Sequence, residues 1–324
     1  MSVGEITEAA AAASGAEAAP EPTSLRDTGP RSDVVVALAQ IAPRLGEVGP
    51  NLQRHLELIA EARRRGADVI VFPELSLTGY FLKDLVPDVA VRLQGEEIAE
   101  LCAAAQDIDV VCGAVLEEDD HRFYNAGVYL AGGEIAHVHR KVYLPTYGLF
   151  DEGRYFAQGS RFRTFEAGAG QATLPRAWRA AMLVCEDLWH PTSLSLLARQ
   201  GIDVVIVLSA SPGRGVGKGF ALGTARSYDA MTRTYAQLHT TYLVFCNRVG
   251  YEDGVNFWGG SRVVDPRGHV DGEPAGKDET LQLHRIDLAV LRRARIINPL
   301  LRDERHDIVD TETDRLRRRA GDRD

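Results

Sequence analysis

Residues 180–208, AAMLVCEDLWHPTSLSLLARQGIDVVIVL, decide the fold that this sequence predicts. Ala180–Val184 and Val204–Leu208 are short apolar runs of the kind that form buried strands, and Thr192–Gln200 between them is expected to be a helix. A strand, a helix and a second strand in succession indicate a sheet with helices packed on it. The polar segment 185–191 joins the first strand to the helix.

The same alternation continues in both directions along the chain. Segment 51–66 carries apolar residues at helical spacing, whereas Gly132-Gly133 between two strand-like runs signals a hairpin. Strands are expected at 34–40, 69–72, 110–115, 124–130, 135–140, 242–246, 260–264 and 281–286, and helices at 51–66, 96–106 and 224–238. Because no linker interrupts this pattern, we predict one mixed α/β domain with its sheets covered by helices.

The two ends of the chain differ from this body. Residues 1–33 are rich in Ala, Glu, Pro, Ser and Gly and lack the basic and apolar regions of a signal peptide, so we expect a disordered leader. Residues 311–324 are dominated by charged side chains, which predicts a charged tail. The folded domain is therefore expected to span residues 34–310.

Composition narrows the classes of partner. The 324 residues are 45% hydrophobic and 26% charged, as in soluble globular proteins, and the formal net charge is −9. This acidity argues against nucleic acid or a membrane surface as the main partner, although a local basic patch is compatible with it. No apolar run approaches the roughly 18 residues of a membrane span. Four cysteines without a CxxC pair favour a reduced, cytoplasmic protein.

Three segments place a reactive side chain at the end of an apolar strand. In the first, VFPELSLTGY at residues 71–80, Glu74 follows a strand and Pro73. Catalytic groups of α/β folds concentrate at the carboxyl ends of strands, which makes Glu74 a candidate. The alternative is a surface carboxylate that caps the following helix.

The second segment is HRKVYLPTYGLFDE, residues 139–152. Lys141 ends an apolar strand and precedes a loop constrained by Pro145 and Gly148. A lysine there would remain protonated if carboxylates faced it, and would then offer a fixed positive charge. The alternative is an ordinary solvated strand end.

The third segment contains Cys185, at the point where a strand stops and a helix soon begins. Backbone N–H groups at such a turn can lower the pKa of a thiol and can also receive an oxyanion. The alternative is a buried structural cysteine, the interpretation we give to Cys102, Cys112 and Cys246. Cys185 differs because two acidic residues follow it directly.

Together these segments resemble the nitrilase, or carbon–nitrogen hydrolase, superfamily, whose Glu–Lys–Cys triad has this order along the chain. Glu74, Lys141 and Cys185 match it within FPELSLTGY, RKVYLP and VCEDLWHP. The resemblance implies an α-β-β-α sandwich that usually pairs into dimers or larger assemblies. It extends over most of the body through LSASP (208–212), NRVG (247–250), NFWGGS (256–261), VDPRG (264–268) and PLLRDER (299–305).

Within the superfamily the sequences of these segments are most similar to those of the glutamine-hydrolysing domain of glutamine-dependent NAD synthetase. In that enzyme an ATP-using domain with an SGGxDS-type loop follows, and this sequence contains no such loop. If the released ammonia feeds a synthetase, we therefore expect the synthetase to be a separate chain.

The resemblance also assigns roles to the residues. Glu74 would carry protons, Cys185 would attack the substrate, and Lys141 with the backbone N–H of Glu186 would hold the oxyanion. Glu152 would be a second carboxylate that orients Lys141 or the substrate amide; alternatively it is one of a solvated acidic pair with Asp151. The positions implied to bind substrate are Tyr80, Tyr147, Glu186, Trp189 and Ser211.

Three other features of the sequence do not support the sites that they first suggest. Segment 213–219 lacks the first Gly and the final Ser or Thr of a P-loop, so we interpret it as a loop over the pocket mouth from which Arg214 or Lys218 could reach substrate. The histidines share no metal-ligand spacing, so neither zinc nor another cofactor is expected. His190 suggests a Cys–His pair with Cys185, but the Glu–Lys–Cys set explains more residues.

The leading functional hypothesis is hydrolysis of a small carboxamide, glutamine or a similar compound, to a carboxylate and ammonia through a thioester. A nitrile or an N-carbamoyl amine would use the same triad and is the alternative within this chemistry. A catalytically silent, partner-binding homologue is the alternative from another class. The expected partners are the small amide, a second copy of the chain and a separate ammonia-using synthetase.

Overall fold

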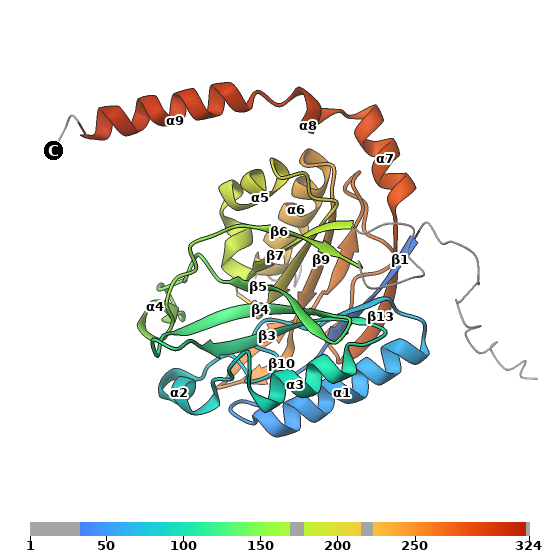
Figure 1. Cartoon of the computed structure of the whole chain (residues 1–324), viewed down its shortest axis with the longest axis vertical. Coiled ribbons are helices and arrows are strands. Elements are labelled where there is room, and N and C mark those ends of the chain that lie inside the picture. The colour runs from blue at the N-terminus through green and yellow to red at the C-terminus, as the bar shows by residue number, and fades with distance from the viewer. Residues whose placement is uncertain (1–32, 169–177, 215–222, 322–324) are drawn as a thin grey trace, which may run out of the picture.

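The computed structural model describes residues 33–168, 178–214 and 223–321. Two main sheets lie face to face at the centre, and helices cover the outer face of each (Figure 1). The first sheet has the order β13 (Thr280–Asp287), β1 (Asp33–Gln40), β2 (Val69–Val71), β3 (Asp109–Glu117), β4 (Phe123–Ala131) and β5 (Glu134–Arg140). The second has the order β12 (Arg262–Val264), β9 (Tyr242–Asn247), β8 (Val204–Ser209), β7 (Trp178–Val184) and β6 (Thr164–Ala167).

Each sheet has a parallel centre and antiparallel edges. Strands β1, β2 and β3 are parallel, as are β7, β8 and β9, and the remaining pairs run antiparallel. The hairpin expected at Gly132-Gly133 joins β4 to β5. A separate two-stranded ribbon consists of β10 (Val249–Glu252) and β11 (Val255–Trp258).

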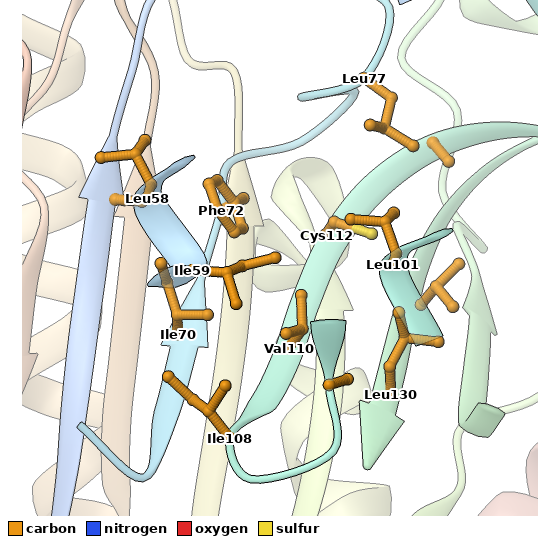
Figure 2. Packing of buried hydrophobic residues seen from close by; sticks show 14 of the residues in the cluster. Leu58, Ile59, Ile70, Phe72, Leu77, Leu101, Ile108, Val110, Cys112 and Leu130 are labelled. Carbon is orange, nitrogen blue, oxygen red and sulfur yellow. The ribbon is translucent and has the colours of Figure 1, made fainter. Parts of the chain in front are cut away.

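Alternation of side chains along the strands creates the layers. Val35, Ala37 and Ala39 of β1 pack beneath α1 (Val48–Arg64) and α3 (Glu96–Ala104). Their neighbours along β1 face the second sheet, because successive side chains of a strand point to opposite faces. Figure 2 shows the outer layer, where Leu58, Ile59 and Leu101 of the helices meet Ile70, Val110, Cys112 and Leu130 of the strands.

Two helices cover the second sheet in the same way. α5 (Pro191–Ala198) and α6 (Gly223–Leu238) pack on β7, β8 and β9 through Leu194, Leu197, Tyr228 and Ala236. The order of layers is therefore helix, sheet, sheet, helix, which confirms the predicted α-β-β-α sandwich.

Shorter elements and the C-terminal helices complete the described chain. The short ones are η1 (Lys83–Leu85), α2 (Val86–Val89), α4 (Glu152–Tyr155) and η2 (Cys185–Trp189), and the last helices are α7 (Leu288–Ile297), α8 (Leu300–Asp303) and α9 (His306–Gly321). The charged tail expected from residue 311 forms most of α9, which projects from the sandwich (Figure 1). Arg199 ties α9 to the end of α5 through a two-pronged ion pair with Asp310, at 2.8 and 2.7 Å.

Parts of the predicted division into leader, domain and tail fall on residues that the structure does not describe. Of the expected leader, residues 1–33, all but Asp33 lie outside the described residues. The division into leader, domain and tail stays a prediction. None of the described helices has the length and apolar character needed to cross a membrane.

The sandwich brings several strand ends to one place. Glu74 lies three residues beyond β2, Lys141 directly follows β5, Cys185 directly follows β7, and Ala210 directly follows β8. Gly113 of β3 lies under the loop that carries Glu74, so closely that a Cβ there would stand 2.3 Å from Leu75 N and 2.8 Å from the carbonyl carbon of Glu74.

We predict that Gly113→Ala destabilises the protein by roughly 1–3 kcal/mol, because the added methyl group would push against backbone atoms that cannot yield without moving Glu74. Gly49→Ala in α1 is the matched control, since nothing lies within 4 Å of its Cβ position. Urea unfolding of both variants measures the difference. Equal stability of the two variants would contradict this account of the Glu74 loop.

Candidate active site

The ammonium of Lys141 lies between two carboxylates. Its Nζ donates to Glu74 Oε1 and to Glu152 Oε1, each at 2.7 Å. The Lys141 side chain is 0% exposed, and Glu74 and Glu152 are also buried. Burial by itself would lower the pKa of Lys141, but the charges of Glu152 and Glu74 outweigh it and raise the pKa well above its usual value. The lysine is therefore a fixed positive charge.

Glu74 is held by donors on both of its oxygens. Oε1 accepts from Asn125 Nδ2 at 2.8 Å as well as from Lys141, and Oε2 accepts from the backbone N–H of Ala210 at 2.7 Å. Leu75, the next residue, has a left-handed φ of 48°, which bends the loop directly after the carboxylate. These contacts fix Glu74 in the interior of the protein, so it is not the surface helix cap considered as the alternative.

Cys185 lies on a sharp turn between β7 and η2. Its φ of 44° is in the left-handed region, which a non-glycine residue adopts only when the surroundings hold it there. Its Sγ lies 3.3 Å from the hydroxyl oxygen of Tyr228 on α6 and accepts from the hydroxyl of Ser209 at 3.5 Å. The residue is 7% exposed, so it is buried but retains some access to solvent.

The charge state of the sulfur differs from the sequence-based expectation. A turn rich in N–H groups was expected to lower the pKa of the thiol; instead burial raises it, the charge of Glu74 raises it further, and Lys141 only partly opposes them. The resting sulfur is therefore a neutral thiol. A base must take its proton before it can attack a substrate.

Glu152 is an integral part of this cluster. Besides Lys141, its Oε1 accepts from the hydroxyl of Tyr80 at 2.5 Å, while its Oε2 is buried and has no hydrogen-bond partner among the described residues. Burial raises the pKa of Glu152 to about 7, against the attraction of Lys141 and with the repulsion of Glu74. The solvated pair with Asp151 that we considered does not form. A cavity of about 300 Å³ adjoins Tyr80 and Glu152.

The other positions implied to bind substrate lie around Cys185 or Glu152. Tyr147 donates its hydroxyl to Glu186 Oε1 at 2.8 Å, and Trp189 donates its Nε1–H to Tyr228 at 3.1 Å. Ser211 is buried and accepts from Trp258 Nε1 at 3.2 Å. Tyr147 and Trp189 are exposed, whereas Tyr80 is buried against Glu152, so the first two are better placed to meet an entering molecule.

One residue that the sequence analysis did not select organises the site. Both oxygens of the Asp187 carboxylate are used: Oδ1 accepts from the backbone N–H groups of Val142 and Tyr143, and Oδ2 accepts from that of Val184, each at 3.0 Å. His139 Nε2 lies 2.8 Å from Oδ2. Asp187 thus joins the segment after Lys141 to the turn at Cys185. Its position two residues after the cysteine was the only signal in the sequence.

Three further residues were candidates in the sequence: His190 as a partner of Cys185, and Arg214 and Lys218 as residues at the mouth of the pocket. His190 stacks on Tyr143 at a ring distance of 3.5 Å, and the Cys185 sulfur contacts Tyr228 and Ser209, which favours the Glu–Lys–Cys arrangement over a Cys–His pair. Arg214 lies over the ring of Phe150, 4.3 Å from its centroid. Lys218 lies outside the described residues.

Comparison with known proteins agrees with this geometry. Residues 35–296 match the family model described as carbon-nitrogen hydrolase. The chain belongs to the carbon–nitrogen hydrolase family. It is therefore a hydrolase that acts on carbon–nitrogen bonds. Separately, among the described residues no group of three His, Cys, Asp or Glu side chains could hold a metal ion.

Relatives of this carbon–nitrogen hydrolase fall into two kinds. The glutamine-dependent NAD(+) synthetase of Acinetobacter baylyi is 32% identical over 81% of this chain, but the match covers 46% of that protein. A structure of glutamine-dependent NAD+ synthetase from Acinetobacter baumannii superposes with a TM-score of 0.69 at 29% identity, covering 80% of this chain and 46% of that one. The chain thus spans about half the length of these relatives. An (R)-stereoselective amidase of a Pseudomonas species is 34% identical, with 83% of this chain and 91% of the amidase covered.

We predict that Asp187→Asn lowers the free energy of unfolding by at least about 2 kcal/mol, because an amide cannot accept from every donor that now points at the carboxylate, and a buried N–H would be left unpaired. Asp253→Asn is the control: its partner Lys83 and Asp253 itself are exposed, so this change should cost less than about 1 kcal/mol. Denaturant unfolding compares the two, and a similar cost for both would be evidence against a bracing role for Asp187.

We also predict that hydrolysis speeds up as the pH rises through about 7, the pKa of Glu152. The ionised form accepts from Lys141 and Tyr80 and holds the ammonium in place, whereas protonation weakens that ion pair. Glu152→Gln should lower the rate and abolish this acid limb. Asp151→Asn, at the exposed neighbouring carboxylate, should keep the limb, and profiles of kcat/KM against pH for the three proteins decide the matter.

Proposed function

We propose that this carbon–nitrogen hydrolase cleaves the carboxamide of a small substrate, glutamine or a glutamine-like compound, to a carboxylate and ammonia through a thioester on Cys185. The observation that carries the proposal is the buried cluster of Glu74, Lys141 and Glu152 beside a thiol that needs a base. The similarity to about half the length of glutamine-dependent NAD synthetases supports glutamine as the model substrate.

The reaction would begin with a proton transfer. Glu74 takes the proton of the Cys185 thiol as the sulfur attacks the amide carbon, and the carbonyl oxygen becomes an oxyanion. Lys141 and the backbone N–H of Glu186, in the first turn of η2, would receive that charge. Both donors are fixed before the substrate arrives, so little reorganisation is needed in the transition state.

The second half returns the enzyme to its starting state. Glu74 gives its proton to the leaving nitrogen, ammonia departs, and the acyl group remains on sulfur as a thioester. A water molecule then attacks the thioester while Glu74 takes its proton, and the carboxylate product leaves as the thiol re-forms. In this scheme Glu152 orients Lys141 and keeps it charged.

A second candidate is a carboxamide other than glutamine. It is favoured by the (R)-stereoselective amidase, because that relative is matched over nearly its whole length. Nitriles and N-carbamoyl amines would use the same cysteine, the first through a thioimidate and the second through an S-carbamoyl intermediate. The released fragments separate them, since a carbamoyl compound yields carbon dioxide together with ammonia.

We further propose that the protein works in the cytoplasm as a homo-oligomer and supplies ammonia to a synthetase on a partner chain. Four free cysteines support a reducing compartment. Apolar side chains on α7 and α8, including Ile296, Ile297 and Leu300, are exposed and support contact with a second copy. The proposal of a synthetase partner rests on the names of the relatives of which this chain spans about half the length, the glutamine-dependent NAD synthetases.

We predict that Cys185→Ser abolishes measurable turnover and that Lys141→Ala lowers kcat by at least about 100-fold, as loss of an oxyanion donor does in other hydrolases. Cys102→Ala, at a partly exposed cysteine on α3, should retain activity. Ammonia release from a panel of amides including glutamine measures the rates, and circular dichroism checks that each variant is folded.

Mass spectrometry of the reacting enzyme provides the direct observation. A glutamine-derived or other acyl group attached to Cys185 would identify the substrate's acyl half. Inertness toward every amide, together with a Cys185 that does not react with iodoacetamide, would overturn the proposed function.

A further inference from the structure

A basic groove lies beside β5, an edge strand of the first sheet. Its cavity measures about 530 Å³, and its lining includes Arg122, Tyr124, His137, Arg140, Arg161 and Arg163. One wall comes from β4 and β5, and the other from segment 158–163, which precedes β6. Glu74, Lys141, Glu152 and Cys185 do not line it, so the groove is distinct from the active site.

The groove carries an excess of positive charge that the surrounding chain does not neutralise. Four arginines line it against a single carboxylate, Glu118. Arg140 pairs with Glu118, and Arg122 pairs with Asp120. In the described part of the chain Arg161 and Arg163 have no carboxylate partner, and Arg163 donates only to the neighbouring carbonyl of Phe162, at 3.3 Å. Two full cations therefore remain available in an otherwise acidic protein.

Two nitrogens of the lining residues are buried without a hydrogen-bond partner. They are Nε of Arg140 and Nε2 of His137. Burial lowers the pKa of His137 to about 4, so its ring is neutral in the empty groove, where it stacks on Phe165 at 4.4 Å. Buried polar groups in folded proteins are usually hydrogen-bonded, so these two nitrogens can take a further partner.

Two of the four arginines, Arg122 and Arg140, are also held in place. The guanidinium groups of Arg122 and Arg140 both lie over the ring of Tyr124, 5.8 and 5.3 Å from its centroid. Such cation–π contacts restrict long side chains that would otherwise move freely. Part of the entropy that binding costs is therefore already lost in the empty groove.

We propose that the basic groove binds a small phosphate-bearing anion. Guanidinium groups bind phosphate and carboxylate oxygens with paired, charge-assisted hydrogen bonds. A carboxylate offers two oxygens in one plane, whereas a phosphoryl group offers oxygens in several directions. Guanidinium groups line both walls: Arg140, paired with Glu118, lies on β5, and the unpaired Arg161 and Arg163 lie on segment 158–163. The phosphoryl group therefore fits the arrangement better. The volume lies within the range of about 300–1,000 Å³ that is usual for small-ligand sites.

The groove is structurally joined to the catalytic lysine. His139, which lies in its wall, contacts the Asp187 carboxylate that holds the segment after Lys141. Gly159 of the opposite wall donates its N–H to the carbonyl of Lys141 at 2.7 Å. A bound anion would thus brace the two segments that meet at Lys141 without touching the reacting atoms.

Isothermal titration calorimetry of the whole chain with inorganic pyrophosphate tests the proposal, at physiological ionic strength set with chloride. We expect one molecule of pyrophosphate per chain. The double variant Arg161→Gln, Arg163→Gln should bind about tenfold more weakly or worse, because it loses two charge-assisted contacts at exposed positions that the fold does not need. Its hydrolytic activity in the absence of pyrophosphate should equal that of the unmodified protein.

The control removes the same charge elsewhere. Arg302→Gln combined with Arg317→Gln changes two exposed arginines on α8 and α9 and should leave pyrophosphate binding unchanged. An absence of heat with pyrophosphate and with inorganic phosphate would overturn the proposal, as would equal weakening by the two double variants.

Two further titrations separate the sources of the phosphoryl group and the competing class of ligand. Flotation with phosphatidylcholine vesicles that contain a phosphoinositide reports on lipid head groups. Binding to these vesicles alone, without binding of free pyrophosphate, would contradict a small-molecule site. Binding of a poly-glutamate peptide that pyrophosphate does not displace would likewise contradict it, because an acidic protein segment would then be the ligand.

Discussion

The buried ammonium of Lys141 is the interaction on which the rest of the site depends. A charge in the interior is costly unless it is paired and hydrogen-bonded, and here two carboxylates approach it from two separate segments of chain. Removing Lys141 would leave two buried carboxylates facing each other without a cation. The three side chains therefore specify one another's positions, and a sandwich that misplaced any of them would be less stable.

The surrounding backbone is adapted to that constraint. Two residues of the site have a left-handed backbone conformation. One is Leu75, which directly follows Glu74, and the other is Cys185 itself. These conformations cost free energy and persist where packing determines them. Asp187 and Gly113 supply that packing, one through hydrogen bonds to two segments and the other by leaving space for the Glu74 loop.

Much of the fold could be predicted from the sequence, and the reasons are local. The central strands are short apolar runs bounded by turn residues, and α1 has a clear apolar face. The strands of the β10–β11 ribbon and β6 were missed because each has only four residues and a mixed pattern. α7 was missed because its apolar residues are interrupted by arginines, and only Leu291 and Ala294 are buried.

The site could be predicted only in part. Glu74, Lys141 and Cys185 follow apolar strands, which drew attention to them, and the family resemblance gave them an order. Asn125 and Tyr228 carry no such signal, since one lies within a strand and the other on the buried face of a helix, where each would be interpreted as core. Asn125 reaches Glu74 across β3 within the first sheet, and Tyr228 reaches Cys185 where α6 packs on the second sheet, so both contacts depend on tertiary structure.

The net charge of the sequence likewise does not predict the local charge of a site. A value of −9 describes the whole chain, and it disfavours an extended anionic partner. It says nothing about where the positive charges gather. Arg122 and Arg163 are far apart in sequence, yet the β4–β5 hairpin and the segment before β6 bring them to one groove. Local potential depends on tertiary structure, so a small anionic ligand is compatible with an acidic protein.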